Sequence, residues 1–354
     1  MGSRAWRPVV TRRRLQVSLA FLWLLDGALQ LQPFMFTRGF GTQVVAPSAA
    51  GQPAPVAAVI SWSASIISGH PVAADLVIAG VQLALGIGLL LPRMARVALV
   101  ASAAWALGVW LFGEGLGGVL GGTGTLFNGA PGAALLYAVL ALGAWPRLDP
   151  GARRLRPWRR GELRPTIVAF TTNARDDAPA RWLPLAWAGT WLLFAALQAL
   201  PANRTPAALG AQVGQGASSL PGPLAHLDHV LGAALAHQSA GPAMAVALEV
   251  VIGLLALHQG TARRVAAVCG TAVALAVWVL AQGLGQLASG TATDPNAALL
   301  VGLLGIGVLG TTARTQDRAR TRAPARTRAP AHTPFVIEER SLPTERRHGD
   351  LEVA

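Results

Sequence analysis

WLFGEGLGGVLGGTGT, from Trp110 to Thr125, places a single glutamate, Glu114, in a glycine run directly after an apolar segment. A second stretch, WVLAQGLGQLASGTAT from Trp278 to Thr293, repeats this pattern with Gln282 in place of Glu114. Seven positions of the first stretch carry the identical residue 168 positions later. The chain is therefore predicted to contain two copies of one structural unit, each with a glycine-rich loop at the same place.

Other short matches occur in the same order at nearly the same spacing. They pair ALQLQP at 28–33 with ALQALP at 196–201, GTQV at 41–44 with GAQV at 210–213, His70 with His237, and Gln82 with Glu249. Each unit is expected to contain four helices. Because four is an even number of membrane crossings, both copies then share one orientation, related by an axis along the membrane normal.

The composition is that of a membrane protein. The chain is 53% hydrophobic and only 13% charged, and its 29 basic residues are all arginine. A net charge of +13 could indicate nucleic-acid binding. We exclude nucleic acid as a partner because the arginines lie in loops and tails between apolar stretches long enough to cross a bilayer. The single cysteine, Cys269, lies inside one such stretch and excludes an intramolecular disulfide.

About 20 apolar residues cross the hydrocarbon core of a bilayer, and the sequence predicts eight such spans. They are 15–36, 72–91, 95–112, 131–146, 182–200, 240–257, 264–281 and 297–312. With eight spans, 27 of the 29 arginines fall on one side and only Arg38 and Arg204 on the other. By the positive-inside rule this predicts a multi-pass plasma-membrane protein with both termini in the cytoplasm.

These boundaries predict an all-α chain with four parts. They are a first four-helix unit at 1–146, a cytoplasmic arginine-rich linker at 147–181, a second four-helix unit at 182–312, and a disordered cytoplasmic tail at 313–354. The segment that begins at Pro55 is expected to form a helix in the membrane interface. The tail arginines favour contact with anionic membrane lipids.

A four-helix unit whose first span ends in LLDGALQLQPFMF resembles the DoxX/DoxD-like membrane proteins, here tandemly duplicated. The resemblance covers the helix count and the first span of each unit. It implies a non-catalytic or accessory subunit of a redox or quinone-linked membrane system, with quinone as a possible cofactor. The basic residue that the family would place near the end of the first helix is missing, and Gln30 and Gln198 stand near that point instead.

Two carboxyl groups lie at mid-depth in predicted spans. Asp26 is about 11 residues into the first span and shares a helix face with Gln30. Glu249 lies at a similar depth in the sixth span and corresponds to Gln82 of the first unit. Acids at this depth usually face a bundle interior or a cavity. Asp26 and Glu249 could serve a proton or quinone pocket through a raised pKa, or they could be protonated groups that hold neighbouring helices together.

Fewer roles are open to Glu114 than to Asp26 and Glu249, because its counterpart Gln282 can accept hydrogen bonds but cannot act as an acid or base. The role common to both positions is then to accept hydrogen bonds from loop amides that the glycines leave open. Gln43 and Gln212 are further candidates in the outer loops. The alternative is a cation site in the first unit alone.

Three histidines crowd the second outer loop, His226, His229 and His237. His226 and His229 could face one metal ion if their segment is helical. The first unit keeps only His70 at the corresponding place, and so no metal site is predicted.

Function remains open among three classes at this stage. No nucleophile–base pair, haem-ligand pair or nucleotide motif is visible in the sequence, so autonomous catalysis is not expected. The protein could be the accessory subunit described above, a small-solute or proton-coupled transporter or channel, or a scaffold that binds another membrane or envelope protein through its outer loops.

Overall fold

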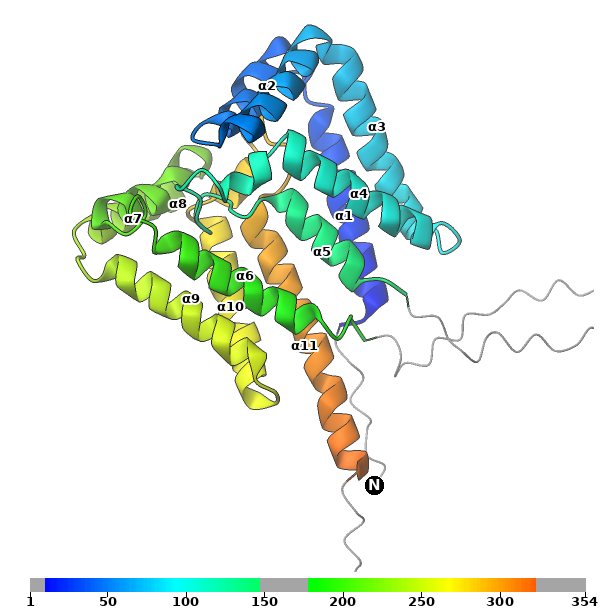
Figure 1. The fold of residues 1–354 in the computed structure, drawn as a ribbon, viewed down its shortest axis with the longest axis vertical. Helices are drawn as coiled ribbons and strands as arrows, with labels where there is room; N and C mark the ends of the chain where they lie inside the picture. Colours follow the sequence, from blue (N-terminus) through cyan, green and yellow to red (C-terminus); the bar gives the residue numbers. More distant parts are fainter. Residues whose placement is uncertain (1–9, 147–177, 323–354) are drawn as a thin grey trace, which may run out of the picture.

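The computed structural model describes residues 10–146 and 178–322, and within these ranges the protein is helical with no β-strand. The all-α prediction is confirmed for this part of the chain. Figure 1 shows the helices arranged as two groups that meet in the middle of the molecule.

The first group packs four apolar helices around one core. They are α1 (Arg12–Gln30), α3 (Pro71–Leu90), α4 (Ala95–Phe112) and α5 (Ala133–Gly143). α1 contacts α3 and α5, and α4 also contacts both. The connection from α1 to α3 contains η1 (Phe40–Val45), η2 (Ala46–Ala49) and α2 (Ala54–Gly69). α2 is the helix expected from Pro55 onward.

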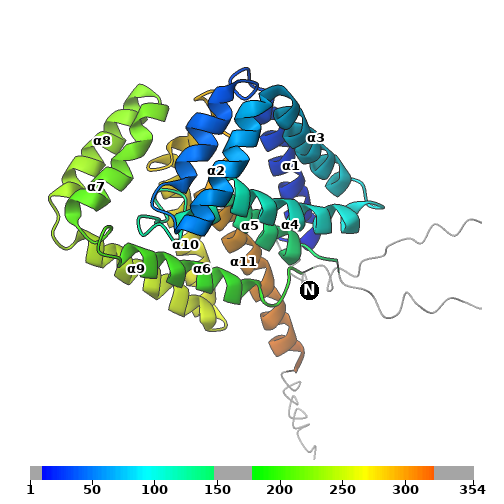
Figure 2. The same ribbon diagram turned by 45° about the horizontal axis from the view of Figure 1, so that its top comes forward.

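The second group repeats these contacts. It consists of α6 (Leu183–Gln198), α9 (Gly241–Leu257), α10 (Thr261–Val279) and α11 (Ala297–Arg322), with α7 (Pro206–Gly214), η5 (Gln215–Ser219) and α8 (Gly222–Ala236) between α6 and α9. α6 contacts α9 and α11, and α10 contacts the same two helices. The groups meet where α11 packs against α5 (Figures 1 and 2).

The turns rich in arginine share one end of the molecule, which we call the arginine end. The start of α1, the α3–α4 turn and the α9–α10 turn lie along its lower and right-hand margin in Figure 1. Arg13 donates to the carbonyls of Leu89 and Leu90 at the end of α3, and Arg263 donates to those of Ala256 and Leu257 at the end of α9. The arginines thereby satisfy carbonyls that have no partner within their own helix.

The opposite end, which we call the loop end, carries α2, α7, α8 and the two glycine-rich loops. These loops contain η3 (Gly115–Gly118) and η6 (Gly283–Gln286) and have the same backbone conformation. Leu116 and Leu284 both have φ of 57°, a value rarely seen for leucine. Trp110 and Trp278 each donate an indole N–H to a proline carbonyl, that of Pro131 and Pro295 respectively, at 2.7 Å.

Three of the described helices, α3, α4 and α10, are long and apolar enough to cross a membrane. A fourth span is possible if α8 and α9, bent by 105°, are counted together. α5 has only 11 residues, about 16 Å of helix, because glycine and proline occupy the first part of the predicted span 131–146. The eight-span prediction is therefore not confirmed, although an apolar membrane protein is compatible with these helices.

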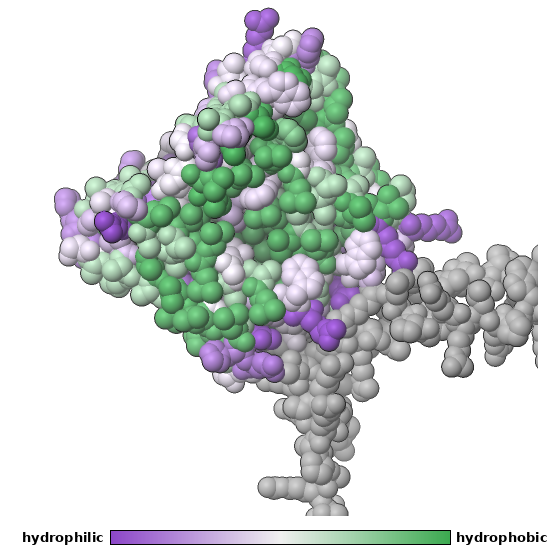
Figure 3. All heavy atoms as spheres, in the orientation of Figure 1, coloured by the Kyte–Doolittle hydropathy of each residue, from purple (hydrophilic) through white to green (hydrophobic). Residues whose placement is uncertain are grey.

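The outer surface of these helices is apolar. Val97 on α4 and Met244 on α9 are 69% and 67% exposed, and large aliphatic side chains of α3 and α10 are exposed as well. Figure 3 shows hydrophobic residues across the broad middle of the molecule and hydrophilic residues gathered toward its corners. Such a continuous apolar surface fits contact with lipid better than contact with water.

The predicted boundary of the tail needs one correction. α11 continues to Arg322, ten residues beyond the predicted end of the last span at residue 312. The apolar run ends there, but the arginine-rich sequence that follows still has good helix formers. Residues 323–354 and most of the predicted linker 147–181 lie outside the described residues.

Candidate functional site

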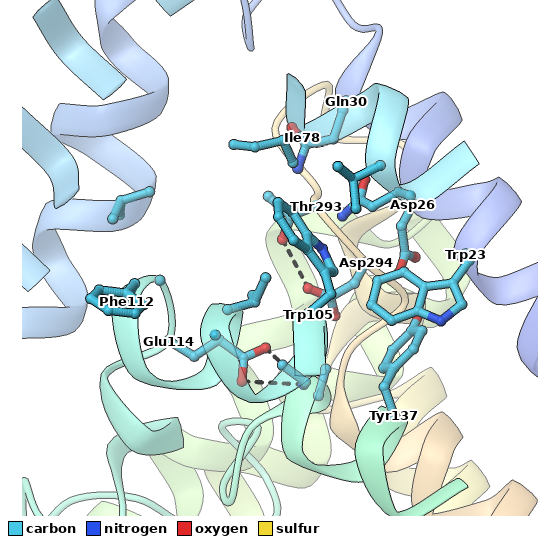
Figure 4. Close-up of a pocket in the computed structure, with 18 of the residues that line it drawn as sticks. Trp23, Asp26, Gln30, Ile78, Trp105, Phe112, Glu114, Tyr137, Thr293 and Asp294 are labelled. Atoms are coloured by element: carbon cyan, nitrogen blue, oxygen red, sulfur yellow. Dashed lines mark hydrogen bonds between the residues drawn. The ribbon is translucent and has the colours of Figure 1, made fainter. Parts of the chain in front are cut away.

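A partly open cavity of about 820 Å³ lies in the first group, between α1, α3, α4, α5 and the η1–α2 segment. We call it the inner cavity. Its walls are mostly apolar and aromatic, with polar side chains among them, several of which Figure 4 labels. Those polar side chains are Asp26, Gln30, Ser48, Ser63, Gln82, Glu114, Tyr137, Thr293 and Asp294.

Asp26 is carried into the inner cavity by α1. It is 1% exposed, and its Oδ1 has no hydrogen-bond partner among the described residues. Tyr137 of α5 lies near it (Figure 4) and interacts with it electrostatically, without a hydrogen bond of good geometry to its hydroxyl. The Tyr137 ring packs on that of Trp23, with centroids 4.5 Å apart, and the Trp23 indole donates to Ser102. The aromatic pair thus holds Tyr137 beside the carboxyl.

Gln30 and Gln82 add two amides to the same cavity from α1 and α3. Their side chains are 2% and 5% exposed, and neither Oε1 has a hydrogen-bond partner. An unsatisfied buried polar atom costs about 1–3 kcal/mol. The inner cavity therefore holds polar groups that a bound molecule could satisfy.

Glu114 lies just after α4 and reaches the first turn of α5. Both of its carboxylate oxygens accept from the amide of Ala134, at 3.0 and 3.2 Å. An acceptor at a helix N-terminus satisfies an amide that has no partner within the helix. Burial raises the pKa of Glu114 from its ordinary value of 4.5 to about 8; nearby Asp294 adds to this, and the backbone hydrogen bonds oppose it.

Asp294 comes from the second group, in the loop before α11, yet it lines the cavity of the first. Its Oδ2 accepts from the hydroxyl of Thr293 at 2.8 Å and its Oδ1 from the amide of Asn296 at 2.7 Å. Burial raises the pKa of Asp294, and these two hydrogen bonds lower it in part. Sequence reasoning missed this residue. A signal was present, because AALL occurs at both 133–136 and 297–300, and this match places Asp294 opposite Ala130.

In the second group the corresponding space is filled. The residue opposite Asp26 is Phe194, which is fully buried and stacks edge-on against Trp191 with centroids 5.5 Å apart. Trp187, also fully buried, packs on Trp191 and donates to the carbonyl of Val301. None of the four ionisable residues of the inner cavity has an ionisable counterpart at the matching position of the other unit. In the sequence match, Asp26 corresponds to Phe194, Glu114 to Gln282, Tyr137 to Val301, and Asp294 to Ala130.

Gln282 has the same contact as Glu114 and an additional one. Its Oε1 accepts from the amide of Ala298 in the first turn of α11, and its Nε2 donates to the carbonyl of Leu126 in the first group. The hydrogen bond expected at both positions is present, and the amide belongs to a helix start rather than to the glycine run.

The remaining predicted polar residues lie elsewhere. Gln198 donates to the carbonyl of Asn203, and Gln212 donates to the Asn203 side chain, within the second group. Gln43 is exposed. Glu249 is 4% exposed with an unpartnered Oε2, but it does not line the inner cavity. Asp26 and Glu249, the two acids predicted at mid-depth, therefore do not line the same cavity.

The three histidines lie on and just after α8, so the helical segment assumed for a metal pair exists. All three of them, His226, His229 and His237, are exposed. In the described part of the chain no group of three or more His, Cys, Asp or Glu side chains is arranged to hold a metal ion. The positions of these three histidines therefore do not support a metal site.

Comparisons with known proteins add no assignment to this geometry. No family model matches the chain, and no curated protein or solved structure matches it. The inner cavity and the residues around it are therefore the features that bear on function.

Proposed function

We propose that this chain is an integral membrane protein that binds a lipophilic molecule with a polar head in the inner cavity. We further propose that it acts as an accessory subunit of a quinone-linked redox system, without catalytic activity of its own. The observation that carries the proposal is the combination of mostly apolar walls with Asp26, Gln30, Gln82 and Tyr137 in one buried space.

A quinone fits the chemistry of this cavity. Ligand sites are usually mostly apolar spaces of about 300–1,000 Å³ with a few polar groups that fix orientation, and the inner cavity, at about 820 Å³, falls within that range. A bound quinone would supply carbonyl acceptors that become hydroxyl donors on reduction. The amides of Gln30 and Gln82 can meet either form, because an amide both donates and accepts.

Proton-coupled transport of a small solute is the second candidate. It is favoured by three carboxyls, those of Asp26, Glu114 and Asp294, along one cavity without a lining arginine or histidine. A transporter of this kind would move ions or solute across sealed vesicles, whereas an accessory subunit would not.

The architecture that we propose consists of two duplicated four-helix units in one orientation, eight spans and cytoplasmic termini. The equivalent loop conformations, the paired tryptophan hydrogen bonds and the repeated helix contacts support the duplication. The arginine end would face the cytoplasm by the positive-inside rule. Membrane lipids, and a membrane or envelope protein at the loop end, are the partners that this arrangement would allow.

Reporter fusions test the topology. Reporters at Gly51 and Gly216 should be extracytoplasmic, and one at Arg156 should be cytoplasmic. A cytoplasmic reporter at Gly51 would refute the arrangement, since that position lies between the first two predicted spans.

Mass spectrometry of the purified protein tests the ligand. The protein is extracted in a mild detergent, and its bound small molecules are compared with those of an Asp26→Phe variant, which introduces the residue found at position 194. We expect a quinone at near-stoichiometric ratio in the wild type and its loss in Asp26→Phe. Phe194→Leu serves as the control, because it changes the filled space of the second group and should keep the ligand. Equal quinone in wild type and Asp26→Phe would exclude the inner cavity as its site.

A further inference from the structure

A second hollow of about 450 Å³ lies at the loop end, next to the inner cavity. We call it the outer hollow. Its walls are the glycine-rich loop of the first group, the loop before α11 of the second, and the side chains of Gln52 and Asn128. Many of its lining residues are glycines, which have no side chain to cover the backbone, so backbone polar groups face the hollow and can be solvated there.

The two spaces share part of their lining. Glu114, Thr293 and Asp294 line both, together with Val44, Ser48 and Ala133. Asp26 and Tyr137 line the inner cavity only. Glu114 and Asp294 thus stand at the boundary between a polar outer space and an apolar inner one, and Figure 4 shows Asp294 between Glu114 and Asp26.

The charge of this boundary has no counter-charge among the described residues. Within residues 10–146 and 178–322 no arginine or histidine lines either space, and the titratable groups that face one another are Glu114, Asp294, Asp26 and Tyr137. Two carboxylates without a counter-charge disfavour ionisation of both at once. The raised pKa of Glu114, about 8, agrees with this arrangement, with burial as the larger cause and Asp294 as the smaller.

Polar side chains continue inward from this boundary. Asp26 interacts electrostatically with both Asp294 and Glu114, and its Oδ1 is buried without a hydrogen-bond partner. Gln30 and Gln82 present further unpartnered atoms around the same space. The acids are therefore accompanied by buried polar groups that have no hydrogen-bond partner in the described part of the chain.

Toward the arginine end the core below Trp23 is mostly aliphatic, with buried side chains from four helices, among them Leu19, Leu89, Leu99 and Leu136. Gln16 and Ser102 are buried polar side chains in this region, and both have hydrogen-bond partners: Gln16 donates to the carbonyl of Leu89, and Ser102 accepts from the Trp23 indole. A proton would find no carrier among the aliphatic side chains. The buried polar atoms of the inner cavity that have no partner among the described residues therefore lie toward the loop end, where this cavity shares Glu114 and Asp294 with the outer hollow.

We propose that Glu114 and Asp294 exchange protons between the outer hollow and the inner cavity, so that a molecule in the cavity gains and loses protons at the loop end. The proton passes from water in the outer hollow to a carboxylate oxygen of Glu114 or Asp294, and from there to Asp26, with the reverse order for release. The identity of the molecule in the cavity rests on the function proposed above, but proton exchange at this boundary does not.

Infrared difference spectroscopy on sealed vesicles tests the route without any added ligand. The protein is incorporated with its arginine end inside, as judged by protection of an N-terminal tag from external protease. The outer pH is stepped from below to above 8 while a strong buffer holds the inner pH. We expect a protonated-carboxyl signal that disappears with a midpoint near 8, the pKa of Glu114.

Two variants assign the signal. Glu114→Gln copies the residue at position 282 and should remove it. Asp294→Asn keeps an acceptor oxygen for the amide of Asn296, and its new NH₂ group can donate to the Thr293 hydroxyl; it should lower the midpoint, because one neighbouring negative charge is gone. A signal that follows the inner pH, or one unchanged in Glu114→Gln, would overturn the proposal.

A second measurement checks that the outer hollow is open to water. Ser48 lines both spaces, so Ser48→Cys in a Cys269→Ala background should react with a membrane-impermeant thiol reagent added outside. Ala106→Cys, buried on α4 and outside both spaces, is the control and should stay unlabelled. Labelling of Ser48→Cys only from the inner side would place the opening at the wrong end. Absence of bound quinone would refute the proposed ligand, but it would not change the interpretation of the infrared and labelling experiments, which use no added ligand.

Discussion

Glu114 should make the stability of this protein depend on pH in a direction unlike that of most carboxyl groups. Its pKa is raised from 4.5 to about 8 in the folded protein, so the folded state holds a proton that the unfolded state releases. The contribution of Glu114 to stability is then fully present below about pH 4.5 and is lost as the pH rises through 8.

The magnitude follows from the shift. A single group changes the free energy of unfolding by about 1.4 kcal/mol per pH unit between its two pKa values, which gives a ceiling of about 5 kcal/mol. Glu114 is only partly buried and borders a space that water can enter, so screening reduces this ceiling, and we expect a loss of about 2 kcal/mol.

Thermal or denaturant unfolding in detergent, measured from pH 4 to 9, provides the assay. Wild type should lose stability as the pH rises, and Glu114→Gln should flatten the curve while keeping one acceptor for the amide of Ala134. Asp294 still titrates in that variant, so a weaker slope remains. Glu114→Leu should be less stable at every pH by about 1–3 kcal/mol, because it leaves the Ala134 amide unsatisfied. An equal slope in wild type and Glu114→Gln would refute the reasoning.

Two further changes test the packing. In Gly117→Ala, at φ of +62°, the new Cβ would collide with the carbonyl oxygen of Pro131, and we expect a loss of about 2–4 kcal/mol in unfolding free energy. Gly122→Ala has a similar φ, +78°, with open space around it, so it should lose only about 1 kcal/mol, and equal losses would contradict the collision. Arg13→Ala should lower stability by about 1 kcal/mol, since it removes the side-chain donor to the carbonyl of Leu90, while the carbonyl of Leu89 keeps Gln16 as a donor. Exposed Arg96→Ala should change little, and an equal effect would show that these hydrogen bonds do not matter.

The sequence predicted the helical class, the helix after the first span and the polar groups on α1 and α3, because each of these depends on local composition and periodicity. It also predicted the hydrogen bond accepted by Glu114, through comparison with Gln282. Helix lengths were harder, since glycine and proline near Ala133 shorten α5 without making the segment less apolar.

The sequence could not predict which polar residues share a space. Periodicity gives the face and depth of Asp26 and Glu249, but not which helices lie next to one another. Asp294 enters the inner cavity from a loop more than 150 residues after Tyr137. That approach depends on how the two groups of helices meet, which no local pattern encodes.

The contribution of Thr293 and Asp294 to the inner cavity has a consequence for how the protein is made. Chains are synthesised from the N-terminus at about 5–20 residues per second, so roughly eight to thirty seconds separate the appearance of Tyr137 from that of Asp294. During this interval all four helices of the first group have been synthesised, while the residues of one wall of the cavity, Thr293 and Asp294, have not. A ribosome that stops before residue 293 would release a chain whose inner cavity lacks the wall formed by Thr293 and Asp294.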